Sequence, residues 1–184
     1  YSFPMVPELQ SVFFPVYADS TKTFRENAMK PISVITGLTL AFGLAAPAAA
    51  QQVLASNPQS VIDYFFQAGV PAQLTTDSVG DPLVEFRVDA DTYQVFFYDC
   101  TDNSDCLALQ FYTGYRVDGD VTLDIINGWN MDRRFVRAYM TDEGAARIEM
   151  DIATGADGVS QRDFGELYNL WLESVRLFEE RINW

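Results

Sequence analysis

Histidine is absent from all 184 residues of the sequence. Without an imidazole, the chain cannot assemble a Ser-His-Asp or Cys-His nucleophile system, and zinc sites of the histidine-rich type are excluded as well. Pairs of carboxylates remain available for acid and base chemistry, as in glycoside hydrolysis. We expect no catalytic residue, no metal ligand and no cofactor. We therefore expect a protein that is not an enzyme, with a carboxylate-based hydrolase of envelope polymers as the alternative.

Lysine is absent from residues 51–184, which hold 9 arginines against 23 aspartates and glutamates. This region therefore carries a net charge of −14, which is also the net charge of the whole chain. Nucleic-acid affinity comes largely from basic side chains that displace counterions from phosphates. So negative a surface repels phosphate backbones and anionic lipid headgroups. We expect no nucleic-acid partner, whereas a protein partner remains open.

Cysteine is scarce: the chain has only Cys100 and Cys106, with five residues between them. An oxidising compartment favours their pairing, and turn-forming residues between them would place both near the ends of paired strands. Closure of so short a ring stabilises a fold by about 2 kcal/mol. Neighbouring acids disfavour the low thiol pKa that a redox role needs. We expect a structural disulfide.

The acidic cysteine loop offers oxygen ligands in Asp99, just before Cys100, and in Asp102, Asn103 and Asp105. Oxygen ligands suit calcium, so a calcium-dependent envelope protein is a further alternative. The loop lacks the glycine and the terminal glutamate of an EF-hand loop. We favour solvated turn residues here.

The sequence has no apolar run of the length that spans a membrane. The apolar stretch 32–44 has about 13 residues, against the roughly 20 of a spanning helix. Met29 and Lys30 precede it and three alanines end at Ala50, a pattern typical of a secretory signal peptide. We expect residues 29–50 to be removed after Ala50, and residues 1–28 to lie upstream of the mature protein. Residues 51–184 would then be periplasmic or secreted, without a transmembrane anchor.

Hydrophobic periodicity in residues 51–184 predicts one α+β domain. Asn57 and Pro58 begin a first helix that ends near Gly69. Strands are predicted at 72–76, 83–88, 93–97, 107–115, 135–140 and 146–152, with a short second helix at 123–130. A long helix begins near Ser160. We expect an antiparallel sheet of about five or six strands with three helices, in the order α-β-β-β-β-α-β-β-α.

The last helix has the clearest pattern. Apolar residues step by three and four along one side of it: Phe164, Tyr168, Trp171, Val175, Phe178 and Ile182. This side is expected to cover the sheet. Further leucines at 167, 170, 172 and 177 widen the apolar surface and leave room for a homodimer or partner interface.

Residues 127–139, NGWNMDRRFVRAY, fit the pattern N-x-W-N-x-x-R-R-F-x-x-A-Y. Supporting segments are residues 76–82, the cysteine pair ahead of 109–112, and residues 149–151 and 158–160. On these motifs the chain resembles the YbjN family, labelled sensory-transduction regulators, over residues 57–182. The resemblance implies a fold like that of type III secretion chaperones, often found as a dimer, and brings no catalytic residues. Many relatives lack a signal peptide, which sets this chain apart.

A candidate partner surface lies in the same segment, at Trp129, Arg133, Arg134 and Arg137. The arginines suit an anion clamp, although ion pairing with the protein's own acids is the interpretation that we favour. Trp129 is either an exposed anchor or, as its helical spacing favours, a core residue. The leading hypothesis is an exported, non-enzymatic binding, chaperone-like or regulatory protein whose partner is another protein.

Overall fold

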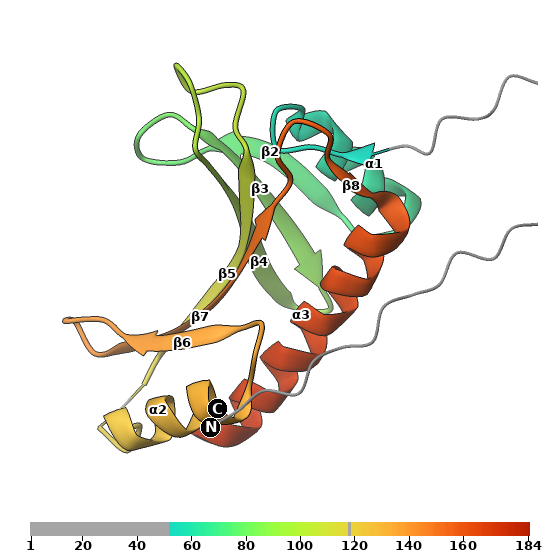
Figure 1. Ribbon diagram of the computed structural model, residues 1–184. Helices are drawn as coiled ribbons and strands as arrows, with labels where there is room; N and C mark the ends of the chain where they lie inside the picture. The colour runs from blue at the N-terminus through green and yellow to red at the C-terminus, as the bar shows by residue number, and fades with distance from the viewer. Residues whose placement is uncertain (1–51, 118) are drawn as a thin grey trace, which may run out of the picture. The chain divides into compact units, whose positions relative to one another are not determined.

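The computed structural model describes residues 52–117 and 119–184 (Figure 1). The expected upstream segment 1–28, the signal peptide 29–50 and the cleavage site at Ala50 lie outside the described residues. Within the described ranges, no helix is both long enough and apolar enough to cross a membrane.

A six-stranded antiparallel sheet forms the centre of the domain, in the strand order β2-β3-β4-β5-β7-β6. Four strands follow one another along the chain, and the β6–β7 hairpin then places β7 beside β5. The strands are β2 Ala72–Thr76, β3 Pro82–Val88, β4 Asp91–Tyr98, β5 Ala108–Arg116, β6 Arg137–Met140 and β7 Ala145–Ala153. The predicted α+β class and order of elements are confirmed.

Three helices accompany the sheet: α1 Pro58–Gln67, α2 Leu123–Asp132 and α3 Gln161–Ile182. Pro58 stands in the first turn of α1, where its missing N–H costs nothing. Thr122 and Ser160 cap α2 and α3, because each side chain accepts a hydrogen bond from the backbone N–H three residues ahead. The long α3 runs across one face of the sheet, and α2 lies at the end of the molecule beside β6 (Figure 1).

The core lies between α3, α1 and the sheet. The predicted stripe of α3 is buried along its whole length, from Phe164 to Ile182. Its Trp171 stacks on Phe111 of β5 with 5.7 Å between ring centroids, and burial of each such ring stabilises the fold by about 2–3 kcal/mol. The further leucines of α3 are half-buried and pack against this same core, so they do not form a separate apolar face.

Two short strands add an element that periodicity did not predict. β1 Gln52–Val53 pairs antiparallel with β8 Val159–Ser160 and so ties the start of the described domain to the start of α3. Gly158 precedes β8 with a φ of 77°, and a Cβ there would lie 2.8 Å from the Val53 carbonyl oxygen. The close approach of the two backbones therefore requires glycine.

Candidate functional site

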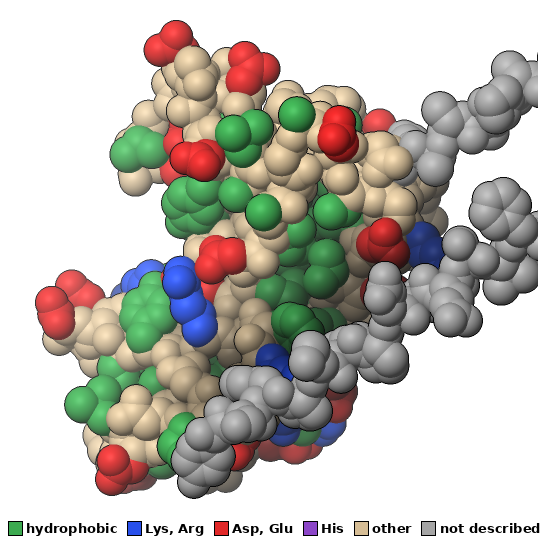
Figure 2. Space-filling view, in the orientation of Figure 1, with side chains coloured by type: hydrophobic (Ala, Val, Ile, Leu, Met, Phe, Trp, Pro, Cys, Tyr) green, Lys and Arg blue, Asp and Glu red, His purple; other side chains and the backbone are tan. Residues whose placement is uncertain are grey.

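Among the described residues, helices cover one face of the sheet and no helix covers the other. Alternation along β4, β5 and β7 directs Val95, Phe111 and Ile148 into the core. The intervening side chains are mostly half-buried or exposed and line the opposite face, among them Gln94, Tyr98, Tyr112, Arg116, Arg147 and Asp151. Figure 2 shows basic side chains gathered over the β6–β7 hairpin. We call this the helix-free face, and it is the candidate functional site.

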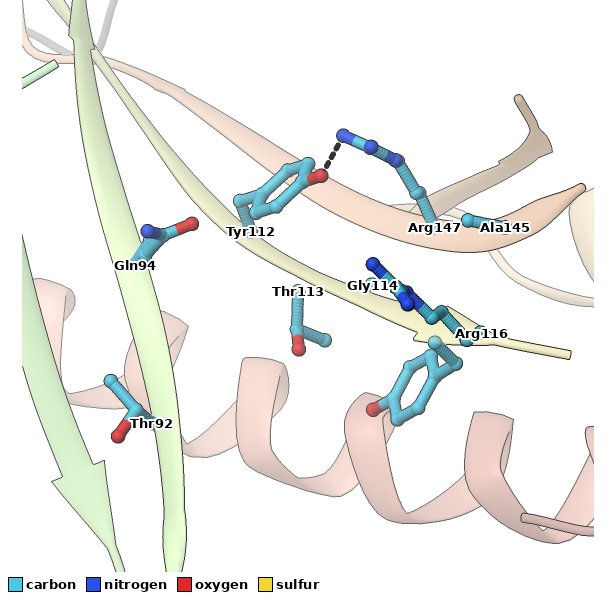
Figure 3. A pocket seen from close by; sticks show the side chains of 9 residues that line it. Thr92, Gln94, Tyr112, Thr113, Gly114, Arg116, Ala145 and Arg147 are labelled. Atoms are coloured by element: carbon cyan, nitrogen blue, oxygen red, sulfur yellow. Dashed lines mark hydrogen bonds between the residues drawn. The ribbon is translucent and has the colours of Figure 1, made fainter. Parts of the chain in front are cut away.

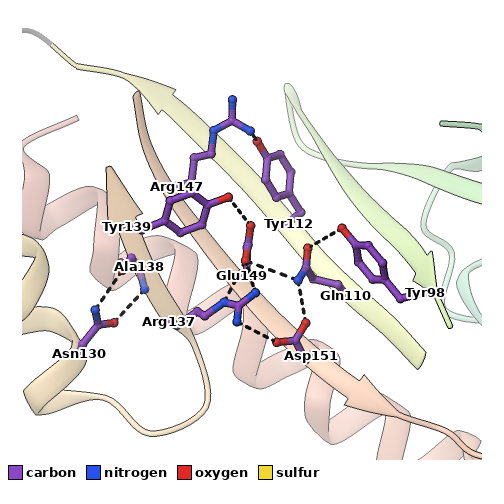
Figure 4. Close-up of polar contacts among 10 residues, drawn as sticks. All are labelled: Tyr98, Gln110, Tyr112, Asn130, Arg137, Ala138, Tyr139, Arg147, Glu149 and Asp151. Atoms are coloured by element: carbon purple, nitrogen blue, oxygen red, sulfur yellow. Dashed lines mark hydrogen bonds and ion pairs between the residues drawn. The ribbon is translucent and has the colours of Figure 1, made fainter. Parts of the chain in front are cut away.

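Helix α2 closes the outer edge of β6, the strand at one end of the sheet. Asn130 accepts a hydrogen bond from the Ala138 N–H at 2.8 Å and donates its amide to the Ala138 carbonyl at 2.9 Å (Figure 4). The indole Nε1 of Trp129 donates to the Val136 carbonyl at 2.8 Å. These side chains occupy backbone groups that a neighbouring strand would otherwise use. The outer edge of β6 is therefore closed to a further strand, and hydrogen bonds from α2 fix the position of β6.

Two side chains of β6 contact Glu149 of β7. Arg137 Nε and Nη2 donate to Glu149 Oε2 at 2.9 and 2.6 Å, and the Tyr139 hydroxyl donates to Oε1 at 2.5 Å. Only 6% of Glu149 is exposed, so its charge depends on these donors. Burial, followed by the hydrogen bond to Glu149, raises the pKa of Tyr139 to about 12. The hydrogen bond to Glu149 likewise raises the pKa of Arg137.

Gln110 extends the network toward β4. Its amide donates to Asp151 at 2.7 Å and more weakly to Glu149 at 3.4 Å, while its oxygen accepts from the Tyr98 hydroxyl at 3.3 Å (Figure 4). A shallow hollow of about 700 Å³ lies over these residues, with Tyr98 and Tyr139 among its lining side chains. This end of the face is polar, aromatic and internally hydrogen-bonded. Both oxygens of Glu149 already accept hydrogen bonds, an arrangement that suits structural support better than proton transfer.

The other end of the helix-free face contains Arg147 and Arg116. Arg147 donates to the Tyr112 hydroxyl, and its guanidinium carbon lies 5.3 Å from the Tyr112 ring centroid. A Cβ at Gly114 would lie 3.3 Å from Cγ of Arg147, so glycine leaves room for the arginine stem. These residues line a second hollow of about 410 Å³ (Figure 3).

Comparison with protein families identifies the chain. A family model described as "Putative bacterial sensory transduction regulator", YbjN, matches residues 57–184. The chain belongs to the YbjN family. A comparison with curated proteins gave no match. The family description supports a regulatory or binding role and suggests protein partners.

The structure explains the most specific motif of this YbjN domain as an edge-closing device. Within residues 127–139, Trp129 and Asn130 hydrogen-bond to the edge of β6, while Arg137 and Tyr139 reach Glu149 on the helix-free face. Gly128 contributes as well: Arg181 of α3 lies so close that a Cβ at Gly128 would stand 2.5 Å from its Nη2. The motif therefore joins α2, α3 and β6.

The candidate partner surface needs a correction at Trp129. This side chain is fully buried, which places it in the core and removes it from the surface. Arg133 lies over its ring at 5.3 Å, and Arg134 is exposed. Arg137 pairs with Glu149 and lies 3.6 Å from Asp151, so its charge is met by the protein's own acids. The structure does not bring the three arginines together as one clamp.

The cysteine pair and its acidic loop lie at the β4–β5 turn. Cys100 and Cys106 form a disulfide bond, and Cys106 is fully buried. Asn103 donates to the Val79 carbonyl at 3.2 Å and to Asp81 at 2.8 Å, which ties this loop to the β2–β3 turn. Across residues 52–117 and 119–184, no group of three or more acidic or cysteine side chains is arranged to hold a metal ion.

Sequence reasoning missed Glu149, Gln110 and Arg147. A signal was present, since residues 145–153 alternate between apolar and charged side chains as a strand with two different faces does. The alternation does not reveal which partners face these side chains. Those partners come from β5 and β6, up to 41 residues away along the chain.

Proposed function

We propose that this YbjN-family protein is an exported, non-enzymatic binding module that holds a segment of another protein on the helix-free face of its sheet. The observation that carries the proposal is the composition of this face. Its hollows are lined by tyrosines and arginines, the side chains that protein interfaces prefer as anchors. Tyr98 is 44% exposed and Tyr139 37% exposed, so both rings offer area for contact.

The arrangement of the sheet favours a bound segment that lies on this face rather than one that extends β6. The outer edge of β6 is occupied by Asn130 and Trp129, so strand addition there would first require their removal. The helix-covered face is filled by α3. The helix-free face combines hollows with partly exposed aromatic rings.

Two features support export. The segment at residues 29–50 has the pattern of a signal peptide, and the disulfide between Cys100 and Cys106 persists in oxidising compartments. We expect protein isolated from the periplasm or medium to begin at Gln51 and to resist thiol alkylation unless it is first reduced. Intact-mass measurement reports both properties. Cytosolic protein with an uncleaved leader and two alkylated cysteines would refute the proposal.

Site-specific photo-crosslinking tests the binding face. A photoreactive amino acid at Thr92, which is exposed and lines two hollows, should crosslink to a discrete partner in cells. The matched control is Asn169, exposed on α3. Equal crosslinking from both positions, or crosslinking from Asn169 alone, would show that the helix-free face is not the binding surface.

A further inference from the structure

Positive charge is concentrated on the helix-free face. Four arginines lie on the strands of this face against three carboxylates: Arg87, Arg116, Arg137 and Arg147 against Glu85, Glu149 and Asp151. The rest of residues 51–184 then has five arginines against twenty acids. The strands of this face therefore carry an excess of positive charge, and Glu143 of the β6–β7 turn lies beside Arg116 and Arg147 at one end of it.

Three of the four arginines surround a trough that crosses the strands. Thr92 lines both the hollow of about 410 Å³ and a neighbouring hollow of about 310 Å³, so the two hollows adjoin at this residue. Arg87 pairs with Thr92 across β3 and β4, and Gly114 pairs with Arg147 across β5 and β7. Thr92 and Gly114 are small and form the floor. We call Arg87, Thr92, Gly114, Arg116 and Arg147 the arginine trough.

The trough arginines differ from Arg137 in their partners. Among the residues described, no carboxylate oxygen lies within 4.0 Å of a side-chain nitrogen of Arg87, Arg116 or Arg147, whereas Arg137 has two acidic partners. Arg147 is half-buried, and its Nε is buried without a hydrogen-bond partner. Arg116 and Arg147 both line the hollow of about 410 Å³ (Figure 3). A half-buried guanidinium without an acid is costly unless an external anion meets it.

We propose that the arginine trough binds carboxylate side chains of an extended acidic segment of the partner protein. This inference rests on the proposed function and adds the chemical class of the bound partner segment. Arg87 and Arg147 stand on strands three spacings apart, or about 14 Å, which an extended chain spans in about four residues. Acids at alternate positions of such a segment point to one side and can meet both arginines. Guanidinium forks bind carboxylates through two parallel hydrogen bonds.

The acids elsewhere on the protein do not prevent this contact. At physiological ionic strength the Debye length is about 8 Å, so charges on the helix-covered side of the domain are screened from the trough. Contacts inside the trough are much shorter than this length and are screened less. Local charge therefore decides which segment binds.

Fluorescence anisotropy with a defined probe tests the proposal on the oxidised protein. The probe is a peptide of alternating glutamate and alanine with an uncharged dye, and the matched peptide has glutamine in place of glutamate. We expect the glutamate peptide to bind and the glutamine peptide to bind at least about ten-fold more weakly. Arg87→Gln and Arg116→Gln, both at exposed positions, should each weaken binding about five-fold. Arg162→Gln, exposed on α3, is the control and should leave binding unchanged.

Five outcomes would overturn the proposal. Equal binding of both peptides, or equal losses in Arg162→Gln and Arg87→Gln, would show that the trough does not select carboxylates. Competition by inorganic phosphate at the same concentration as the glutamate peptide would indicate a site for small anions. Dissociation of a dimer by Arg116→Gln in analytical ultracentrifugation would assign the trough to a second copy of the chain. If Thr92 still crosslinks to a partner while the glutamate peptide fails to bind, the binding face stands and only its acidic ligand is refuted.

Discussion

The two ends of the helix-free face use the same strands in different ways. At one end, the charge of Glu149 is met by Arg137 and Tyr139. At the other end, two positions earlier on β7, Arg147 contacts the hydroxyl and the ring of Tyr112, and no ion pair joins it to a carboxylate of the described residues. The number of charged side chains is similar, but the degree to which their charges are paired is not.

This difference separates structural support from binding. A carboxylate that is buried and fully hydrogen-bonded fixes the positions of the strands that hold its donors, because loss of these donors leaves a buried charge. An arginine whose charge is unpaired contributes little to the fold and retains its capacity for an external partner. The comparison predicts that substitutions at the Glu149 end affect stability and that substitutions at the trough affect binding.

The largest stability effect is expected for Glu149→Ala. The substitution removes the charged acceptor for Arg137 and Tyr139 and should lower the free energy of unfolding by about 3 kcal/mol, because hydrogen bonds to a charged group contribute about 1.5–3 kcal/mol. Urea denaturation measures the change. Glu166→Ala, at an exposed position on α3, is the control and should change the free energy of unfolding by less than about 0.5 kcal/mol. An equal effect of both substitutions would remove the structural role of Glu149.

A smaller loss is expected for Asn130→Ala. Two hydrogen bonds to the backbone of Ala138 disappear, and water replaces part of them, so the free energy of unfolding should fall by about 1 kcal/mol. Hydrogen exchange at the Ala138 N–H should accelerate, because the edge of β6 then opens to solvent. Asn169→Ala on α3 controls for the loss of an exposed amide. Unchanged exchange at Ala138 would contradict the edge-closing role.

At the opposite end, Arg147→Gln should change stability little. It removes the contact with Tyr112 but no ion pair among the residues described, so the expected loss is at most about 1 kcal/mol. Binding of the glutamate peptide should fall more than in any single exposed-arginine variant, because Arg147 is the half-buried guanidinium of the trough, whereas Arg87 and Arg116 are exposed. A loss of stability equal to that of Glu149→Ala would erase the distinction between the two ends.

The fold was predictable because its signals are local. Periodicity indicated the order of helices and six main strands, and the buried stripe of α3 from Phe164 to Ile182 is the one that the spacing predicts. The pairing of Cys100 with Cys106 also followed from local spacing and turn residues. β1 and β8 could not be predicted, because strands of two residues have no period to detect and their pairing joins segments about 100 residues apart.

The site was less predictable because its contacts are not local. Arg133, Arg134 and Arg137 are close in sequence, yet the first two follow the end of α2 and only Arg137 lies in β6, so their surroundings differ. Arg147 and Glu149 are single charges in a strand, and no pattern in the sequence predicts a role for either of them. Their difference appears only when β5 and β6 supply the neighbours, through a register that the sequence does not state.

The smallest expected effect is on the pH dependence of stability, through the phenol of Tyr139 at the Glu149 end of the face. The pKa of Tyr139 is raised from 10.0 to about 12 in the folded protein, so the folded state holds this proton more tightly than the unfolded state does. Its stabilising contribution is complete below pH 10 and is lost as the pH rises to about 12. Tyr139→Phe should therefore reduce the fall in stability between pH 10 and 12, as measured by urea denaturation at each pH. Because Tyr93 also has a pKa of about 12, the fall should shrink without disappearing, and an unchanged slope would show that the Glu149 carboxylate does not control this phenol.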